Sequence, residues 1–259
     1  MKKMGAIIFI GFKLKFIYKK AALLTICVSA FSVLILCLFW KAIYPDDPMM
    51  QAYMVRYAAL SQILSVFYVV ESKLSGEIRN GNIAVSLLKP WNYIIAMLQE
   101  NIGKMLANIF LVGLPVFLIC YLLIGFGNFI FFDIIKVMFT IILAFTILFL
   151  VRILVELSCF WVIESWSLVF LSDVIIRILS GSFIPSFIMP EWGKNIMQSL
   201  PFIWIYEMPI RIFLDNSDGL PGIHSGKVVL LQLFWIAVLS GIIAVVWNRG
   251  RKKIAVQGG

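Results

Sequence analysis

The hydrophobic pattern of this chain consists of long apolar runs separated by short polar segments. Each run is near the ~20 residues that an α-helix needs to cross the hydrocarbon core of a bilayer. The runs predict six membrane-spanning helices, at residues 21–43, 52–70, 106–126, 134–157, 167–189 and 228–247. The sequence contains no internal repeat or low-complexity tract that would mark a second domain. We therefore expect residues 1–259 to form a single transmembrane domain.

Residues 2–20, before the first run, have a different pattern. Ile7, Ile10, Leu14 and Ile17 recur at helical spacing, while several lysines fall on the other side. A basic amphipathic helix of this kind, with aromatic side chains, lies in the headgroup plane of a membrane and does not cross it. We expect an interfacial helix here; a basic flank without fixed structure is the alternative.

Composition supports a membrane protein with an all-α fold. The chain is 62% hydrophobic and 14% charged, whereas a soluble domain is roughly half apolar and about a quarter charged. The net charge of +9 is concentrated near the two ends of the chain. In a soluble protein such basic clusters would suggest nucleic acid, but beside membrane spans they indicate orientation, so we expect no nucleic-acid partner.

The polar connections indicate which side of the membrane each one occupies. Residues 44–48 are short and acidic, and residues 125–133 join the third and fourth spans; both suit the outside. The connection between the second and third spans is basic and suits the cytoplasm, where positive residues are retained. Its basic residues are Lys73, Arg79, Lys89 and Lys104. Six spans then place both termini in the cytoplasm, in agreement with the basic clusters.

The fifth predicted span contains residues that interrupt a helix. Gly181 and Pro185 lie inside the apolar run, and Pro190 follows it. Such residues end or kink a helix, and irregular backbone at membrane depth is tolerated only where protein or a water-filled cavity satisfies it. We predict a break near Gly181 and a short re-entrant hairpin on the outer side, with a merely kinked helix as the alternative. Residues 190–227 would then form the longest outer connection.

Some charged residues fall inside predicted spans. Asp173 and Arg177 are four residues apart and share one helix face. Intramembrane charges are costly and often mark a pathway, so this pair is a candidate polar element near the translocation route. The structural alternative is a self-neutralising pair, or a pair bound to a neighbouring helix. Arg152 and Glu156 repeat the spacing, and with Glu164 they fit interfacial anchors.

Several chemical motifs are missing. There is no GxxxxGK[ST] phosphate loop to hold a nucleotide and no HExxH motif. The single histidine, His224, has no cysteine or histidine neighbours in sequence and is a poor metal ligand. The four cysteines lie in apolar surroundings without a CxxC spacing. We therefore predict a chain that is not an enzyme, with no catalytic residue, no metal site and no bound cofactor.

The segment at residues 73–92 is polar and punctuated by glycine, although long apolar runs lie on both sides of it. A turn signal at residues 80–82 is followed by a short apolar run at 83–88 and then by Lys89 and Pro90. The residues leave two interpretations open: a docking element with apolar knobs, or an ordinary cytoplasmic loop.

Two regions resemble type-2 ATP-binding-cassette permeases (ABC-2 permeases) of the daunorubicin-exporter-like branch. The first is GEIRNGNI at residues 76–83, followed by LLKP at 87–90. The second comprises SGSFIP at 180–185, MPEW at 189–192, LPF at 200–202 and YEMP at 206–209, and it is similar to the broken fifth span and outer re-entry segment of that family. The two regions have the family's order and distance, and the resemblance covers nearly the whole chain.

The resemblance implies a division of labour between chains. The cytoplasmic segment between the second and third spans would carry a coupling helix that docks on a separate ATPase subunit, which binds ATP and Mg. Two permease chains, identical or homologous, and two ATPase chains would form an exporter in the bacterial cytoplasmic membrane. The residues implicated in ATPase contact are Gly76, Glu77, Ile78, Arg79, Gly81, Leu87, Leu88, Lys89 and Pro90. Candidates for the outer gate are Gly181, Pro185 and Pro190.

Two other classes of protein remain open from the residues alone. A secondary transporter driven by an ion gradient would show repeated halves and coupling charges at the midplane; the sequence has no repeat, and Asp173 with Arg177 is its one candidate. A non-transporting membrane scaffold or immunity protein would have no need of the docking segment.

Overall fold

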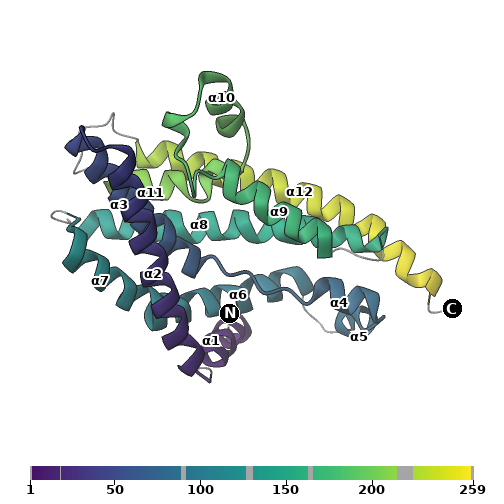
Figure 1. The fold of residues 1–259 in the computed structure, drawn as a ribbon. Helices are drawn as coiled ribbons and strands as arrows, with labels where there is room; N and C mark the ends of the chain where they lie inside the picture. The colour runs from purple at the N-terminus through teal and green to yellow at the C-terminus, as the bar shows by residue number, and fades with distance from the viewer. Residues whose placement is uncertain are drawn as a thin grey trace.

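The computed structural model describes residues 2–17, 19–88, 92–126, 131–162, 166–214 and 224–257, and these residues contain helices but no strand (Figure 1). The N-terminal half contains α1 (Lys2–Phe16), α2 (Lys19–Ile43), α3 (Pro48–Phe67), α4 (Leu74–Arg79), α5 (Ile83–Leu87), α6 (Tyr93–Asn108), the π-helical turn η1 (Ile109–Gly113) and α7 (Leu114–Ile124). The C-terminal half contains α8 (Phe131–Glu156), η2 (Leu157–Phe160), α9 (Trp166–Leu179), η3 (Ser186–Ile188), α10 (Glu191–Ser199), η4 (Phe202–Trp204), α11 (Glu207–Leu214) and α12 (Ser225–Gln257).

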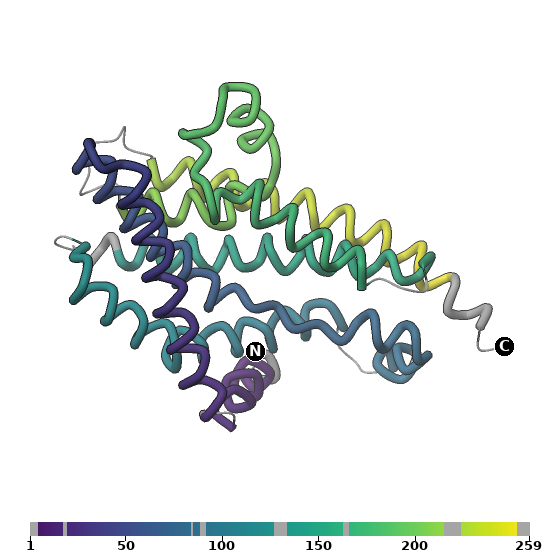
Figure 2. Tube along the Cα trace, in the orientation of Figure 1, coloured from purple at the N-terminus to yellow at the C-terminus, as the bar shows by residue number. Residues whose placement is uncertain are grey.

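The helices form an elongated bundle. α8 packs against α9, α11 and α12, while α2 packs against α3 and α1 packs against α6. The hairpin of α4 and α5 lies at the same end of the bundle as the C-terminus (Figure 2), and this end is called the hairpin end below. The connection between α2 and α3 and the C-terminal end of α7 lie at the opposite end.

Four helical stretches within the described residues are long and apolar enough to cross a membrane: Lys20–Ile43, Tyr93–Ile124, Ile134–Phe160 and Ser225–Lys252. They overlap the first, third, fourth and sixth predicted spans. The second predicted span corresponds to α3, which starts earlier and ends before Tyr68, where the chain becomes extended. The full set of six spans stays a prediction.

The third and sixth spans belong to helices longer than their apolar runs. α6 begins at Tyr93 because the Asn92 side chain caps it, accepting hydrogen bonds from the backbone N–H groups of Ile94 and Ile95. α12 continues to Gln257, beyond the predicted end at residue 247. The two helices meet where the rings of Tyr93 and Trp247 stack, with centroids 6.1 Å apart.

The N-terminal segment is helical, as predicted, and its backbone touches that of α6. Gly11 faces α6 so closely that a Cβ there would overlap the carbonyl oxygen of Glu100. Gly103 faces α1 in the same way, and a Cβ there would overlap the carbonyl oxygen of Ile8. The two glycines therefore permit a close crossing of α1 and α6. The placement of α1 in the headgroup plane stays a prediction.

The region of the fifth predicted span is divided between two helices. α9 ends at Leu179, and α11 begins where α9 stops, because the backbone N–H of Glu207 donates to the carbonyl oxygen of Ser180 at 3.2 Å. Between them the chain makes an excursion at residues 181–206, which carries α10 away from the bundle (Figure 1). We call α9, α11 and this excursion the split span.

The structure corrects the expectation that residues 190–227 form an outer connection. Ile203, Ile205 and Ile210 are at most 1% exposed and belong to the hydrophobic core. The excursion therefore returns to the bundle. The apolar residues of α11 are too few to resemble a span in sequence, and in the structure α11 begins beside the end of α9.

Candidate coupling hairpin and split span

The hairpin of α4 and α5 turns at Gly81, whose φ of 73° lies in the left-handed region that glycine adopts without strain. Leu74 and Ile83, one at the start of each helix, are 0% and 1% exposed and fasten the hairpin to the core. Val85 and Leu88, near its far end, are 65% and 84% exposed. The hairpin therefore presents apolar side chains outward from a buried base.

The residues implicated in ATPase contact lie along this hairpin. Gly76, Glu77 and Ile78 are half-buried on α4, whereas Arg79 and Gly81 are exposed at the turn. Leu87 and Leu88 are exposed at the end of α5. The structure thus brings the described members of this set together on one short element. Lys89 and Pro90 lie outside the described residues.

Glu156 of α8 ties the start of the hairpin to the bundle. Its Oε2 accepts a hydrogen bond from the Ser72 hydroxyl and a longer one, 3.4 Å, from the backbone N–H of Ser75. Glu156 is 5% exposed. The sequence suggested an interfacial anchor for this residue; in the structure its carboxylate instead holds the chain that leads into α4.

Asn101 of α6 makes a second attachment just before the hairpin. Its Oδ1 accepts from the backbone N–H of Glu71 at 2.9 Å, and its Nδ2 donates to the backbone oxygen of Glu71 at 3.0 Å. A third bond, from Nδ2 to the Met97 oxygen, orients the amide. The extended chain before α4 is therefore bonded to α6 as well as to α8.

The Glu71 side chain joins three elements at this base. It forms ion pairs with Lys15 of α1 at 2.6 Å and with Lys104 of α6 at 3.0 Å, and Lys104 also pairs with Glu100 at 2.7 Å. Burial by itself raises the pKa of the Glu71 carboxyl, but hydrogen bonds from Lys15 and Lys104 outweigh it and hold the pKa below its ordinary value. α1, the hairpin base and α6 thus share one charge network.

Sequence reasoning missed these attachments. Glu71, Asn101 and Lys104 are ordinary polar residues near the ends of predicted spans, and no motif relates them. The one usable signal was the group of polar residues at 99–104 in the middle of α6, which is too polar for a helix surface that faces lipid.

A buried carboxylate holds the excursion of the split span. Glu207, the first residue of α11, is 0% exposed. It accepts hydrogen bonds from the backbone N–H of Ser186 at 2.7 Å and from the Ser186 hydroxyl, and Arg211 lies 3.7 Å away. A carboxylate at a helix N-terminus is favourable because the helix dipole is positive there.

Hydroxyl groups of α3 satisfy the backbone at the break. The Tyr57 hydroxyl donates to the carbonyl oxygen of Gly181, and the Ser61 hydroxyl donates to that of Ser182, both at 2.6 Å. Gly181 has φ of 77°, and a Cβ there would lie 2.6 Å from a Glu207 carboxylate oxygen. Protein groups therefore replace the helix hydrogen bonds that are lost at the break.

The break was predicted, but its supporting residues were not. Gly181 lies where the helix ends, Pro185 is buried just before η3, and Pro190 is exposed immediately before α10. Glu207 falls within residues 190–227, for which the sequence predicts an outer connection. Its position in YEMP, directly after the buried Ile205 and Tyr206, was the only sequence signal for a buried acid.

Comparison with known proteins identifies the family of this chain. A family model described as "ABC-2 family transporter protein" matches residues 30–258. The chain belongs to this family. It is therefore a multi-pass membrane protein and an ABC-2 permease, the membrane component of a transporter. No curated protein and no solved structure matches the permease, and the daunorubicin-exporter-like branch stays a prediction.

The ion pair that the structure gives Asp173 differs from the predicted partner. Its Oδ1 lies 2.7 Å from an Arg152 nitrogen of α8, so the acid is bound to a neighbouring helix, which is one of the structural alternatives. Arg177 is exposed on α9, and its backbone oxygen accepts from the Ser182 hydroxyl. In this permease the Asp173 carboxylate thus forms an ion pair between two helices.

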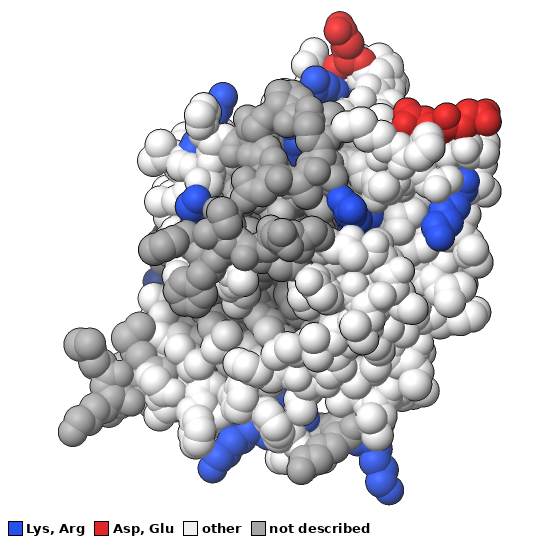
Figure 3. Space-filling model, turned by 90° about the vertical axis from the view of Figure 1, so that its left-hand side faces the viewer, with Lys and Arg blue, Asp and Glu red and all other residues white. Residues whose placement is uncertain are grey.

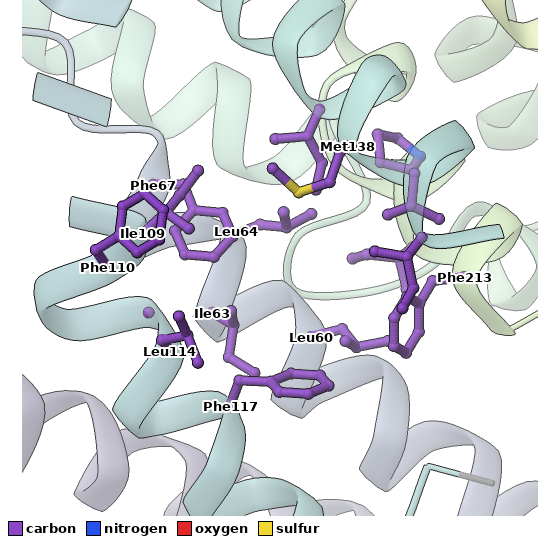
Figure 4. A pocket seen from close by; sticks show the side chains of 16 residues that line it. Leu60, Ile63, Leu64, Phe67, Ile109, Phe110, Leu114, Phe117, Met138 and Phe213 are labelled. Carbon is purple, nitrogen blue, oxygen red and sulfur yellow. The ribbon is translucent and has the colours of Figure 1, made fainter. Parts of the chain in front are cut away.

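The permease contains an apolar cavity of about 380 Å³ near the split span. Side chains from five elements line it, and they include Leu60, Leu64 and Phe67 of α3, Phe110 of η1, Phe117 of α7, Met138 of α8 and Phe213 of α11 (Figure 4). Every lining group shown there is hydrocarbon or thioether apart from one proline nitrogen. Such a cavity accepts an apolar group but has no polar atom to orient a ligand.

The described part of the permease contains no cluster of three or more His, Cys, Asp or Glu residues able to hold a metal ion. His224 is exposed at the start of α12, and the four cysteines are free thiols. Seen from the end opposite the hairpin, basic side chains are scattered around the rim, with acidic ones near its upper margin (Figure 3).

Proposed function

We propose that this permease is the membrane subunit of an ATP-driven exporter in a bacterial cytoplasmic membrane, with both termini cytoplasmic. Two copies, or one copy and a homologous chain, would form the path. Two copies of a separate ATPase would bind ATP and Mg and drive it. The permease itself would supply no catalytic residue.

The observation that carries this proposal is the combination of exposed apolar side chains on α5 and a fastened base in the α4–α5 hairpin. Val85 and Leu88 are largely exposed, although both are apolar, while Leu74 and Ile83 are buried. Exposed apolar residues on a projecting element mark a contact surface when they gather together. A groove on the ATPase would take up these side chains, and Arg79 would set the register.

The fastened base explains how a displacement of the hairpin would reach the membrane. Glu156 connects it to α8, and Asn101 connects it to α6. Both helices belong to stretches long enough to span a bilayer. A push on the hairpin would therefore move two spans directly, without a flexible linker between them.

The split span is the proposed outer gate. Gly181, Pro185 and Pro190 interrupt its helix, so movement there breaks no continuous ladder of backbone hydrogen bonds. The hydrogen bonds from Tyr57 and Ser61 to the break would let α3 follow or drive that movement.

Replacing Leu87 and Leu88 with Asp tests the coupling hairpin. Burying a leucine at a contact contributes about 1.5–3 kcal/mol, and every ~1.4 kcal/mol is tenfold in affinity. We therefore expect at least a tenfold loss of co-purification with the ATPase encoded beside the permease, and a matching loss of transport-coupled ATP hydrolysis. Unchanged co-purification together with unchanged coupled hydrolysis would contradict the proposal.

Met49→Asp is the matched control for this experiment. Met49 is 65% exposed, as Val85 is, but it lies on α3 at the opposite end of the bundle. It should leave co-purification unchanged, which separates loss of docking from a general effect of an added acid. Transport that survives removal of the ATPase and stops with an ionophore would support an ion-gradient transporter instead.

A further inference from the structure

One face of α9 carries a row of side chains that are exposed to a large extent. Trp166, Phe170, Asp173 and Arg177 follow one another at intervals of three or four residues, so they share a face of the helix. Trp166 and Phe170 are 79% and 62% exposed, and their rings stack with centroids 6.1 Å apart. Arg177 is exposed as well. We call these four residues the α9 row.

The charges at this row do not cancel. The carboxylate of Asp173 lies 2.7 Å from an Arg152 nitrogen of α8. Glu207, which begins the helix beside the end of α9, is fully buried and accepts from Ser186. Within the part of the chain that the structure describes, no carboxylate forms an ion pair with Arg177. The three charges of Arg152, Asp173 and Arg177 therefore leave one net positive charge on this face.

This positive charge lies deep in the bundle. α9 runs antiparallel to α8, and the Asp173–Arg152 pair fixes their register (Figure 1). Arg177 is one turn, about 6 Å, further from the hairpin end than Asp173. It is therefore level with the middle of Ile134–Phe160, a stretch that is able to cross a bilayer. At that depth a charged side chain faces protein or a water-filled path, because contact with lipid is costly.

An identical second chain would not neutralise this charge. It would bring the same arginines and the same aspartate to the contact, and the net positive charge would double. A neutralising group has to come from another molecule that reaches the row. In the proposed exporter such a molecule is available, because the path lies between two permease chains and α9 belongs to the split span.

The rest of the row is suited to an apolar body. Trp166 and Arg177 are about 16 Å apart along the helix, and Val174 and Ile178 beside them are 38% and 52% exposed. Aromatic side chains provide a large apolar contact area, and arginine binds oxyanions with charge-assisted hydrogen bonds. The row is therefore complementary to a molecule that has an apolar body and an acidic group at one end.

We propose that the α9 row binds the transported molecule, and that this molecule is an amphipathic anion. Its acidic group would lie at Arg177, and its apolar part would lie along Phe170 and Trp166. Because Arg152 holds the carboxylate of Asp173, that carboxylate does not compete for Arg177. The inference rests on the proposed function, since it needs α9 to face the path, and it adds the class of substrate.

The test compares two photoreactive probes of opposite charge on the purified, full-length permease in phosphatidylcholine nanodiscs. One probe is a dodecanesulfonate with a diazirine on its chain, and the other is the trimethylammonium compound with the same chain. Mass spectrometry of peptides measures the labelling of α9 relative to that of α2, whose exposed apolar surface corrects for probe dissolved in the bilayer. We expect the sulfonate to label α9 at least about tenfold better, because a hydrogen bond to a charged group has a free energy of that order.

Substitutions separate the two parts of the site. Arg177→Gln should remove most of the preference for the sulfonate, and Arg177→Lys should retain much of it, because the positive charge stays. Arg249→Gln is the matched control, since Arg249 is an exposed arginine on α12 outside the row; it should leave the preference unchanged. Phe170→Ala should lower the labelling of α9 by both probes alike, because it removes apolar contact.

Several results would overturn the proposal. Equal labelling of α9 by the two probes would remove the role of Arg177, as would an equal loss of preference in Arg249→Gln. If neither probe labelled α9, a second chain would cover the row. If phosphatidylglycerol displaced the sulfonate probe as well as unlabelled dodecanesulfonate does, the row would bind a bilayer lipid.

These outcomes are distinguishable from failure of the proposed function. The probes are applied to the permease without an ATPase, so their labelling does not depend on docking of the hairpin. Unchanged co-purification after substitution of Leu87 and Leu88 would contradict the coupling proposal whatever the probes label. A failed probe test alongside a successful hairpin test would contradict the substrate class alone.

Discussion

In both the split span and the base of the hairpin a carboxylate holds the chain in place, but the two carboxylates differ in their exposure to solvent. In each, a stretch of non-helical chain is held against helices. Glu207 holds the excursion of the split span with no exposure to solvent. Glu71 holds the hairpin base with a side chain that is 45% exposed and paired with two lysines.

The difference in burial decides how much each contact contributes to the stability of the fold. An interior carboxylate must be fully bonded, because removing its partners leaves uncompensated polar groups without water. A solvent-facing ion pair contributes little and is weakened by salt. We conclude that the contacts of Glu207 contribute more to the stability of the fold than the ion pairs of Glu71 do.

The largest effect is expected at the split span. Glu207→Leu leaves the Ser186 N–H and hydroxyl without their acceptor, and each buried unsatisfied group costs about 1–3 kcal/mol. We expect a loss of about 3–5 kcal/mol in the free energy of unfolding, typical of a broken buried charge contact. Thermal unfolding of the purified protein in detergent measures it.

Glu191→Leu is the control for that measurement, because Glu191 is exposed on α10 within the same excursion. Glu207→Gln should fall between the two, since an amide oxygen can still accept one of the bonds. An unfolding temperature for Glu207→Leu equal to that of Glu191→Leu would remove the contrast with Glu71.

A smaller effect is expected where α1 crosses α6. Gly103→Leu places side-chain atoms where the Ile8 carbonyl lies, and overpacking of this kind costs about 1–3 kcal/mol. Because the backbone of α1 must move away, the Lys15–Glu71 pair should break as well. The measurement is thermal unfolding, together with loss of a cross-link between cysteines introduced at Ile8 and Ile102.

Gly5→Ala is the matched control, because a Cβ at Gly5, also on α1, meets nothing within 4 Å. Its effect should be neutral or slightly stabilising, since alanine favours a helix over glycine by up to about 1 kcal/mol. If both variants keep the cross-link, the packing of α1 on α6 does not depend on Gly103. The proposed contribution of α1 to holding the hairpin base would then be contradicted.

The smallest effect is the pH dependence of Glu71. Its pKa is lower in the folded state than the ordinary value of 4.5, so its contribution is present above that value and is lost as the pH falls through the folded-state pKa. The contribution is at most about 1 kcal/mol, because the side chain is partly exposed. Comparing the unfolding temperatures of the native protein and Glu71→Gln from about pH 7 down to pH 3 measures it.

The gap between the two proteins should be constant near neutral pH and close in acid. Added salt should narrow it at pH 7 as well, because the pair faces solvent. A gap that widens as the pH falls would mean that the carboxyl is stabilised in its protonated form, contrary to the proposed network.

The sequence predicted the elements that depend on local chemistry. The apolar runs located α2, α8 and α12, and Gly181 located the break, because periodicity and backbone-breaking residues act within a few positions of one another. The hairpin was predicted as a docking segment, with its turn at residues 80–82. The bounds differed where polar residues extend a helix beyond its apolar run, as at the start of α6.

What the sequence did not predict depends on contacts between distant residues. Glu207 is bonded to a serine 21 residues before it, and Asp173 is paired with an arginine on another helix. The hydropathy pattern placed Glu207 in an outer connection and left open whether Asp173 pairs with Arg177 or binds a neighbouring helix, because such a pattern contains no information about partners. The return of the excursion as α11 was missed for the same reason, since it is defined by what it packs against.

The length of α12 has a mechanical consequence. Its 33 residues correspond to about 50 Å, against about 30 Å of hydrocarbon, so the helix is stiffer and longer than the layer it crosses. A bilayer that thins or thickens would therefore change the tilt of α12 and the part of it that lies in the hydrocarbon, without shortening the helix. The stacked rings of Tyr93 and Trp247 join α12 to α6 at one level, so a change in the tilt of α12 would be passed on to α6 at that level.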